Sequence, residues 1–226
     1  MRHFFISAGQ ERKMLSIARL VVGYVSTNCY IVCNEQEGSC VIVDPGDNAA
    51  GIIKTMKDKN TEPVAILLTH GHFDHILAVP ELTGAYPDIQ VYAYEAEKAL
   101  LTDAGLNETR MIRKPMTLDS VRYLKDGEEL TLLGAVWRVI STPGHTAGSC
   151  CYYLPEEGIL FSGDTLFDGD CGRTDLPTGN SSAILHSIRE ILMKLPDDTQ
   201  VLPGHETFTT IGRERRQNIV MRMNWA

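Results

Sequence analysis

The run Thr69-His70-Gly71-His72-Phe73-Asp74-His75 places three histidines and an aspartate directly after a short apolar stretch. An apolar stretch of this kind, followed by polar residues, predicts a buried strand that ends where the histidines begin. Residues two apart in an extended chain project to the same side, so His70 and His72 can share one metal ion. Asp74 and His75 turn away where the next helix is expected to begin, and they can serve a second ion.

Three further motifs carry the other candidate metal ligands, His145, Asp164 and His205. They read Pro143-Gly144-His145-Thr146, Gly163-Asp164-Thr165 and Pro203-Gly204-His205-Glu206. Each motif follows an apolar run, so each ligand is expected in a loop beyond a strand, which suits a site built from loops on a rigid scaffold. Together with the first run, these motifs supply the nitrogen and oxygen donors that two borderline metal ions need.

The composition is that of an ordinary globular protein with an excess of acidic side chains. The chain has 226 residues, 43% of them hydrophobic, so a single domain with a sizeable core is expected. A net charge of −8 repels phosphate backbones, so we expect no nucleic-acid partner. No apolar run approaches the length of a membrane span, and Phe4-Phe5-Ile6 is too short for a signal-peptide core. A cytoplasmic location without membrane contact is the expectation.

The cysteines and the remaining histidines point to no second site. The six cysteines contain no CxxC pair, and we expect buried or half-buried thiols in a reducing compartment. Cys171 lies close in sequence to Asp164, but we expect it to pack and not to bind metal. His3 and His186 fall outside the motifs, and we expect both to be ordinary surface or core residues.

Strand signals come in two groups, with helical patterns between them. The first group covers 18–25, 30–33, 39–43, 64–68 and 90–93, and the second covers 130–133, 135–140, 150–154, 158–161 and 200–202. Helices are expected at 49–57, 95–101 and, with the strongest apolar face, 181–195. This order predicts a layered α/β domain. The polar segment 102–119 is expected to be an irregular surface connection.

Several segments beyond the ligand motifs resemble the metallo-β-lactamase superfamily, and within it the short glyoxalase II-like (hydroxyacylglutathione hydrolase-like) hydrolases. They are Thr27-Asn28-Cys29-Tyr30, Val43-Asp44-Pro45-Gly46, Phe161-Ser162-Gly163-Asp164-Thr165-Leu166-Phe167, Cys171-Gly172-Arg173-Thr174-Asp175 and Thr209-Thr210-Ile211-Gly212-Arg213-Glu214-Arg215. The resemblance implies a four-layer αββα sandwich with its site at one edge of the two sheets. It places a single domain at 14–226, and 1–13 is expected to be a dispensable N-terminal extension.

The resemblance also implies how the ligands divide between two metal ions. A first site takes His70, His72 and His145, a second site takes Asp74, His75 and His205, and Asp164 bridges them. Asp44 is implied as an outer group that accepts a hydrogen bond from a ligand histidine. The expected ions are two divalent metals, with zinc favoured over iron or manganese.

Such a site predicts a metal-dependent hydrolase acting on a small-molecule thioester. Two ions about 3.5–4 Å apart lower the pKa of a bridging water to near neutral, and Asp74 would help to hold and orient the resulting hydroxide. No separate general acid stands out in the sequence. This suits a thioester, because a thiolate leaves without prior protonation. S-D-lactoylglutathione or a related acyl thioester is therefore the expected substrate.

Substrate contacts are less determined than the metal site. In glyoxalase II-like enzymes a cation after Cys-Gly contacts the glutathione carboxylate, and Arg173 takes that place here. Pairing of Arg173 with Asp175 in its own loop is an alternative role. The long glyoxalase II enzymes have a tyrosine in place of Asp175 and a C-terminal helical domain beyond the length of this chain. Tight specificity for glutathione thioesters therefore stays open.

Other activities fit part of the same pattern. A persulfide dioxygenase using one iron shares the histidine run and the Gly-Arg-Thr-Asp sequence, and it is the main alternative. Lactone or β-lactam hydrolysis is chemically close but has less support from the flanking segments. A non-catalytic binding module is the least favoured reading, because every ligand position is filled. The sequence does not indicate an oligomeric state.

Overall fold

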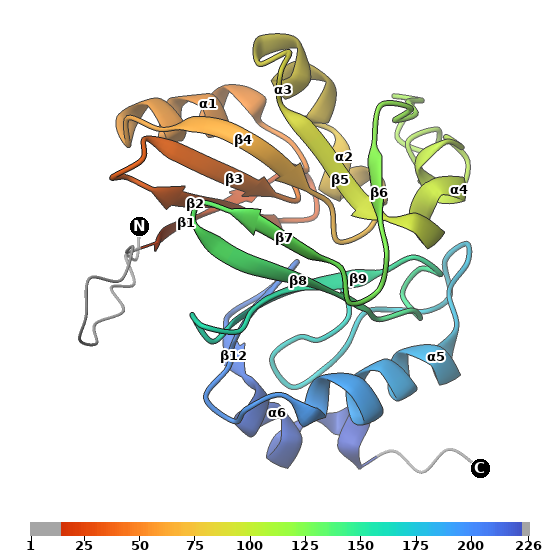
Figure 1. Cartoon of the computed structure of the whole chain (residues 1–226). Coiled ribbons are helices and arrows are strands. Elements are labelled where there is room, and N and C mark those ends of the chain that lie inside the picture. The colour runs from red at the N-terminus through yellow and green to blue at the C-terminus, as the bar shows by residue number, and fades with distance from the viewer. Residues whose placement is uncertain (1–14, 223–226) are drawn as a thin grey trace.

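Two six-stranded sheets form the centre of the molecule (Figure 1). The structure is a computed structural model that describes residues 15–222, so the proposed extension at 1–13 lies outside the described residues. The first sheet runs in the order β1 Leu15–Val22, β2 Thr27–Asn34, β3 Ser39–Val43, β4 Glu62–Leu67, β5 Gln90–Tyr94 and β6 Arg122–Leu124. The second runs β12 Thr209–Thr210, β11 Gln200–Pro203, β10 Ile159–Gly163, β9 Cys150–Leu154, β8 Ala135–Ser141 and β7 Glu129–Leu132.

Helices cover the outer face of each sheet. The chain order on the first sheet is α1 Ala49–Asp58, α2 Phe73–Ile76, α3 Val79–Ala85, the 3-10 turn η1 Glu95–Glu97 and α4 Lys98–Leu101. The second sheet carries α5 Ser181–His186, the π-type turn η2 Ser187–Ile191, the 3-10 turn η3 Leu192–Lys194, α6 Ile211–Gln217 and the 3-10 turn η4 Ile219–Met221. Figure 1 shows the resulting order of helices, sheet, sheet and helices. The predicted αββα sandwich is confirmed.

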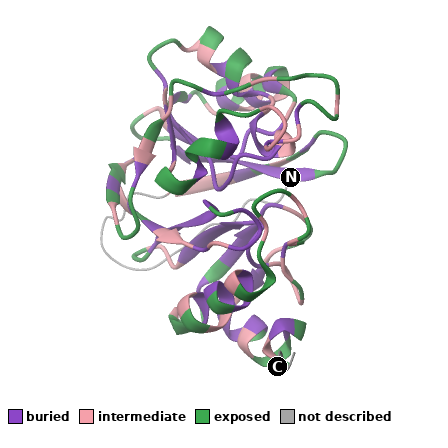
Figure 2. Ribbon diagram, turned by 90° about the vertical axis from the view of Figure 1, so that its right-hand side faces the viewer, coloured by how far each residue is buried: buried purple, intermediate pink, exposed green. Residues whose placement is uncertain are grey.

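Three apolar layers hold these elements together. Because the side chains of a strand alternate between its two faces, neighbouring residues of one strand belong to different layers. Along β2, Tyr30 and Val32 pack between the two sheets, whereas Ile31 and Cys33 face the helices of the first sheet. Successive strand residues point to opposite faces, so a strand with both faces covered is apolar throughout. Figure 2 shows the central strands as buried. A third cluster, which includes Ile188, lies between the second sheet and its helices.

Some expected boundaries were wrong, for local reasons. The strand expected at 18–25 ends at Val22, because Gly23 and Ser26 adopt positive φ angles of 69° and 61° and turn the chain. The helix expected at 181–195 keeps its apolar face, but α-helical geometry stops at His186, where a π-type turn inserts a residue. His186 is exposed, as expected. The strands β6 and β12 and the helices α3 and α6 were not predicted.

The segment 102–119 is irregular as expected, but it is more than a surface connection. Asn107 and Thr109 in it are fully buried. The Thr109 hydroxyl donates to the Asn107 side-chain oxygen at 2.7 Å, and the Asn107 amide donates to the Met116 carbonyl at 3.0 Å. None of the helices between Leu15 and Arg222 is long and apolar enough to cross a membrane.

Candidate metal centre

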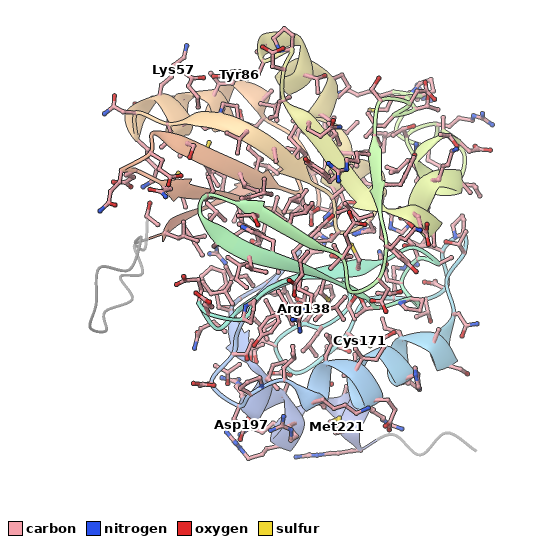
Figure 3. The ribbon with its side chains drawn as sticks, viewed as in Figure 1. Lys57, Tyr86, Arg138, Cys171, Asp197 and Met221 are labelled. Carbon is pink, nitrogen blue, oxygen red and sulfur yellow. The ribbon has the colours of Figure 1, made fainter. Side chains whose placement is uncertain are left out.

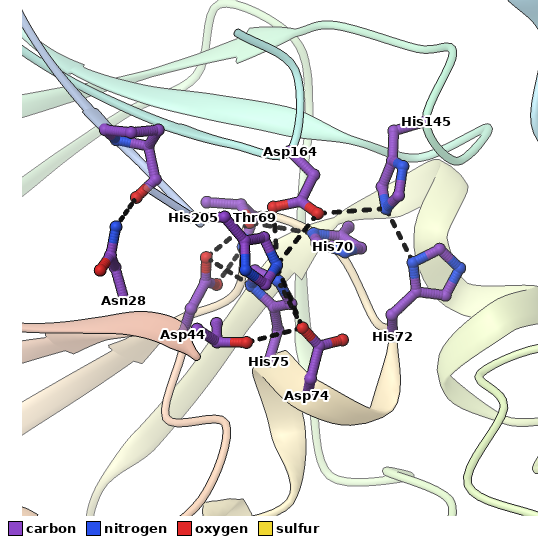
Figure 4. Close-up of polar contacts among 12 residues, drawn as sticks. Asn28, Asp44, Thr69, His70, His72, Asp74, His75, His145, Asp164 and His205 are labelled. Carbon is purple, nitrogen blue, oxygen red and sulfur yellow. Dashed lines mark hydrogen bonds and ion pairs between the residues drawn. The ribbon is translucent and has the colours of Figure 1, made fainter. Parts of the chain in front are cut away.

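The candidate ligands lie just beyond the ends of strands, at one edge of the two sheets. His70 and His72 follow β4, and His145 follows β8. Asp164 comes directly after β10, and His205 lies two residues beyond β11. Parallel strands end at the same edge of a sheet, so the β3–β4 pair and the β10–β11 pair each bring loops together there. Loops from both sheets therefore meet at this edge, and Figure 4 shows their side chains converging.

The first group consists of His70, His72 and His145. Their ligand nitrogens all lie within 4.8 Å of one another. The ring centroids are 4.7 to 4.9 Å apart, and each pair of rings is nearly perpendicular. The Nδ1 atom of His72 lies 2.8 Å from Nε2 of His145. The structure thus brings together the three histidines that were expected to share one ion.

The second group consists of Asp74, His75 and His205, whose ligand atoms also lie within 4.8 Å of one another. Oδ2 of Asp74 lies 3.4 Å from Nε2 of His75 and 3.2 Å from Nε2 of His205. Asp74 and His75 belong to the single turn of α2, for which His72 is the N-cap residue. The chain therefore turns from extended to helical between the ligands of the first group and those of the second, as the sequence predicted.

Asp164 lies between the two groups. Its Oδ2 atom is 3.6 Å from Nε2 of His145 and 3.4 Å from Nε2 of His205, and its Oδ1 atom is 3.4 Å from Nε2 of His75. One carboxylate thus faces nitrogens of both groups. This position is the one that a bridging ligand would take.

An outer set of hydrogen bonds orients the ligand side chains. Asp44 accepts from the backbone N–H of Thr69 at 2.8 Å and from its hydroxyl at 2.7 Å, and Nδ1 of His75 lies 3.0 Å from Oδ2 of Asp44. The Thr27 hydroxyl donates to Oδ2 of Asp74 at 2.6 Å. Such contacts fix the rotamer and tautomer of a metal ligand. Asp44 therefore contacts His75, and Thr27, which was not predicted to contribute, contacts Asp74.

The backbone of Arg173 supplies another outer contact. Nδ1 of His145 lies 2.7 Å from the Arg173 carbonyl oxygen, so this nitrogen donates and leaves Nε2 free to bind a metal ion. The Arg173 side chain points elsewhere and pairs with Asp175, with hydrogen bonds of 2.6 and 2.7 Å. Cys171, labelled in Figure 3, is half-buried, and its N–H donates to Asp170. It belongs to none of the possible metal-binding groups between Leu15 and Arg222.

The two groups differ in how their surroundings shift the pKa values of their histidines. Burial lowers the pKa of His70 well below its ordinary value, with a further lowering by the neighbouring imidazoles. Burial and His145 lower the pKa of His72 to about 3. The rings of His70 and His72 are therefore kept neutral, which is the form that binds a metal.

In the second group carboxylates dominate. Burial by itself would lower the pKa of His75, but Asp74, Asp164 and Asp44 raise it well above its ordinary value. Burial also opposes protonation of His205, yet its hydrogen bonds to Asp164 and Asp74 raise its pKa to about 9. Burial opposes ionisation of Asp74 too, but the charge on His75 holds the pKa of Asp74 far below its usual range. The carboxylates of the second group thus favour a positive charge on His75 and His205. A bound cation would replace the protons on these two rings.

Several buried polar atoms in the centre have no hydrogen-bond partner. They include Nε2 of His70, His72 and His75 and Oδ1 of Asp164. A buried polar atom without a partner costs about 1–3 kcal/mol, and the ligand atoms that His70, His75 and Asp164 offer lie within 4.8 Å of one another. Soft-to-borderline nitrogen donors together with carboxylates match the preferences of zinc, iron and manganese. The residues present therefore fit a metal centre.

Comparison with known proteins agrees with this geometry. The model of the metallo-β-lactamase superfamily matches residues 22–205. The probable metallo-hydrolase YqgX of Bacillus subtilis is 41% identical over 202 residues, which cover 88% of this chain and 94% of the relative. A hydroxyacylglutathione hydrolase of Citrobacter koseri is 39% identical over 175 residues, which cover 77% of this chain but only 60% of that enzyme.

Solved structures give the same result for the fold. The B3 metallo-β-lactamase BLEG-1 superimposes with a TM-score of 0.84 at 38% identity, over 90% of this chain and 98% of the other. TTHA1623 in a di-iron-bound form gives a TM-score of 0.79 at 35% identity, over 89% and 98%. ETHE1 from Myxococcus xanthus gives 0.75 at 28% identity, over 90% and 83%. The family match, the relatives and the fold together show that this chain belongs to the metallo-β-lactamase superfamily.

Proposed function

We propose that the protein is a binuclear metallo-hydrolase that cleaves a small acyl thioester. The position of Asp164 is the observation that carries this proposal. Its carboxylate faces His145 of the first group and both His75 and His205 of the second. A negative group between two sites offsets the repulsion between two cations, which a one-ion centre does not require.

Different residues of the chain would hold each ion and orient the attacking oxygen. His70, His72 and His145 would hold one ion, and Asp74, His75 and His205 the other, with Asp164 shared. Two divalent ions supply acidification of a water molecule and polarisation of the scissile carbonyl. Asp74 accepts from Thr27 and lies beside His205, so its carboxylate is held where it can orient the attacking oxygen. Zinc is the favoured metal, and the di-iron form of TTHA1623 makes iron the first alternative.

The leaving group supports a thioester as substrate. A thiol has a pKa near ~8.5, so its thiolate departs without an added acid, whereas an amide nitrogen needs one. The Citrobacter koseri relative is a hydroxyacylglutathione hydrolase, and S-D-lactoylglutathione is therefore the first substrate to test. This chain spans only 60% of that enzyme. The proposed partner is a small molecule in the cytoplasm, not nucleic acid or membrane.

Anaerobic assays with metal analysis test this function. The purified protein, loaded with zinc, is expected to take up two ions per chain and to hydrolyse S-D-lactoylglutathione or a simpler acyl thioester without oxygen. Protein stripped with a chelator should be inactive and should recover when zinc is returned. One iron per chain, oxygen uptake with glutathione persulfide and no anaerobic thioesterase activity would instead identify a persulfide dioxygenase. Hydrolysis of a lactone or a β-lactam in preference to every thioester would reassign the substrate class.

A further inference from the structure

Glu97 is a buried acid that the proposed reaction does not use. It lies in η1, and only 1% of the residue is exposed. The backbone N–H of Gly71 donates to its Oε1 at 2.8 Å, and the Thr146 hydroxyl donates to its Oε2 at 3.0 Å. Burial raises the pKa of Glu97 to about 7, while these contacts and a hydrogen bond from the Gly148 N–H lower it. Uncharged donors from other segments thus hold the carboxylate in the interior, which is costly without such bonds.

The donors come from the two loops that carry the first candidate site. Gly71 stands between His70 and His72, and Thr146 directly follows His145. Each loop therefore bonds to a different oxygen of the same carboxylate. A planar carboxylate with one oxygen on each loop fixes the spacing between the loops, as a bidentate group does in other polar clusters.

The backbone of both loops packs closely against the turn that carries Glu97. A Cβ atom at Gly148 would lie 2.2 Å from the backbone nitrogen of Glu97 and 2.4 Å from its Oε2. A Cβ atom at Gly71 would lie 2.7 Å from side-chain carbons of both Leu100 and Leu101. Glycine at both positions lets the 95–101 turn lie directly against the two loops.

The second candidate site is held by other residues. Asp74 accepts from Thr27, and His75 lies beside Asp44. Both of these partners belong to or follow strands of the β1–β3 part of the first sheet. Among the described contacts of Glu97, none involves Asp74, His75 or His205. Loss of the Glu97 carboxylate should therefore act on one site and not on both.

We propose that Glu97 is a positioning residue for the first metal site. Its carboxylate joins the loop of His70 and His72 to the loop of His145, and so sets the affinity of that site for its ion. The inference rests on the proposed metal centre but not on the identity of the substrate. Outer residues that orient metal ligands typically change metal affinity by about 10–100-fold when they are replaced.

Glu97→Gln is the variant that tests this proposal. A glutamine has one acceptor oxygen and one amide donor, so it can accept from the Gly71 N–H only if its amide faces the Thr146 hydroxyl, which must then turn from donor to acceptor. Zinc binding is measured by competition with a chromophoric chelator at pH 8, where the carboxylate of the wild-type protein is ionised. We expect one of the two ions to bind about tenfold or more weakly, and the other to change by less than about twofold. His72→Ala and His205→Ala, each of which removes a ligand from one site, identify the ion that is affected.

Glu214→Gln is a matched control. Glu214 is also fully buried, and its carboxylate also accepts from a threonine hydroxyl, a backbone N–H and one further uncharged donor, here Thr209, Gly169 and Asn218. It lies in α6 and contacts neither loop of the first site. We expect this variant to lower the thermal midpoint without changing the affinity for either ion.

The outcomes separate this inference from the proposed function. Unchanged zinc affinities in Glu97→Gln, or an equal loss at both sites, would overturn the positioning role. So would an equal loss of affinity in Glu214→Gln, because the effect would then be one of general stability. If the wild-type protein binds two ions but hydrolyses no thioester, the proposed substrate is wrong while the comparison of these variants still decides the role of Glu97.

Discussion

The guanidinium of Arg173 is paired with the carboxylate of Asp175, two residues along the same loop. The two hydrogen bonds measure 2.6 and 2.7 Å, and both side chains are more than half exposed. This pairing lowers the pKa of Asp175 to about 2. The group proposed to bind a substrate carboxylate is therefore already bound to one from its own chain, and a substrate must compete with it.

Asp175→Asn should release Arg173 for substrate. We expect KM for an acidic thioester to fall by about two- to fivefold with kcat unchanged, because exposed ion pairs are weak and a remote contact acts equally in ground and transition states. KM for a neutral thioester should not move. In the Asp175→Asn and Arg173→Ala double variant the gain should disappear. Equal KM values for acidic and neutral thioesters in all of these proteins would show that Arg173 only braces its loop.

Asp164→Ala should damage the centre more than the loss of any single histidine. Asp164 is the group that faces both candidate sites, and its negative charge is needed when two cations lie close together. We expect loss of at least one bound ion per chain and of nearly all turnover. Metal analysis after gel filtration measures the first effect and steady-state kinetics the second. Retention of two tightly bound ions in this variant would remove Asp164 from the bridging position.

Much of the fold could be predicted because most strands of both sheets are short apolar runs in the sequence. The strands β3 and β9 begin and end where the sequence placed them. The strand β6 has only three residues and carries the polar Arg122 at its start, so it lacks an apolar run of its own. Its place in the sheet comes from pairing with β5. Short edge elements of this kind depend on tertiary contacts, and local sequence does not specify them.

The sequence pointed to the inner residues of the candidate site and to Asp44, whereas its other outer contacts were not predicted. Histidine and aspartate spacing reports which residues can reach one metal ion, and the structure brings all of the predicted ligands together. Glu97 gives no such signal, because an acid in a short helical pattern looks the same whether it is buried or solvated. Thr27 was part of a family-like segment, but its contact with Asp74 joins residues 47 positions apart. Such contacts follow from the packing of loops and cannot be read from spacing.

The metal-free protein should lose stability as the pH rises from about 6.5 to about 9. The carboxylates of Asp164 and Asp74 raise the pKa of His205 to about 9, so the folded state holds a proton that the unfolded state releases at its ordinary pKa of 6.5. The stabilisation is therefore complete below pH 6.5 and disappears toward pH 9. Its size is on the order of 2 kcal/mol after allowance for the partly exposed ring.

Denaturant unfolding in excess chelator measures this effect across the pH window. His205→Gln should show a smaller loss of unfolding free energy over the same range, since its amide cannot bind the proton. With zinc present the wild-type protein should show the opposite trend, because the ion and the proton compete for the same ring nitrogen. A metal-free wild-type protein with no more pH dependence than His205→Gln would contradict the assigned shift.

Gly204→Ala should weaken metal binding by steric means alone. A Cβ atom at Gly204 would lie 2.2 Å from Oδ1 of Asp164 and 2.8 Å from Cε1 of His75, so the Asp164 carboxylate must move. We expect weaker binding of zinc, with a fall of about tenfold or more, since a misplaced ligand forfeits much of its bond to the ion. Gly84→Ala is the control: it lies in α3 with nothing within 4 Å of an added Cβ, and it should leave zinc affinity unchanged and stabilise the helix by about 0.5–1 kcal/mol. Competition with a chelator measures both variants, and wild-type zinc affinity in Gly204→Ala would show that Asp164 can shift without loss of either ion.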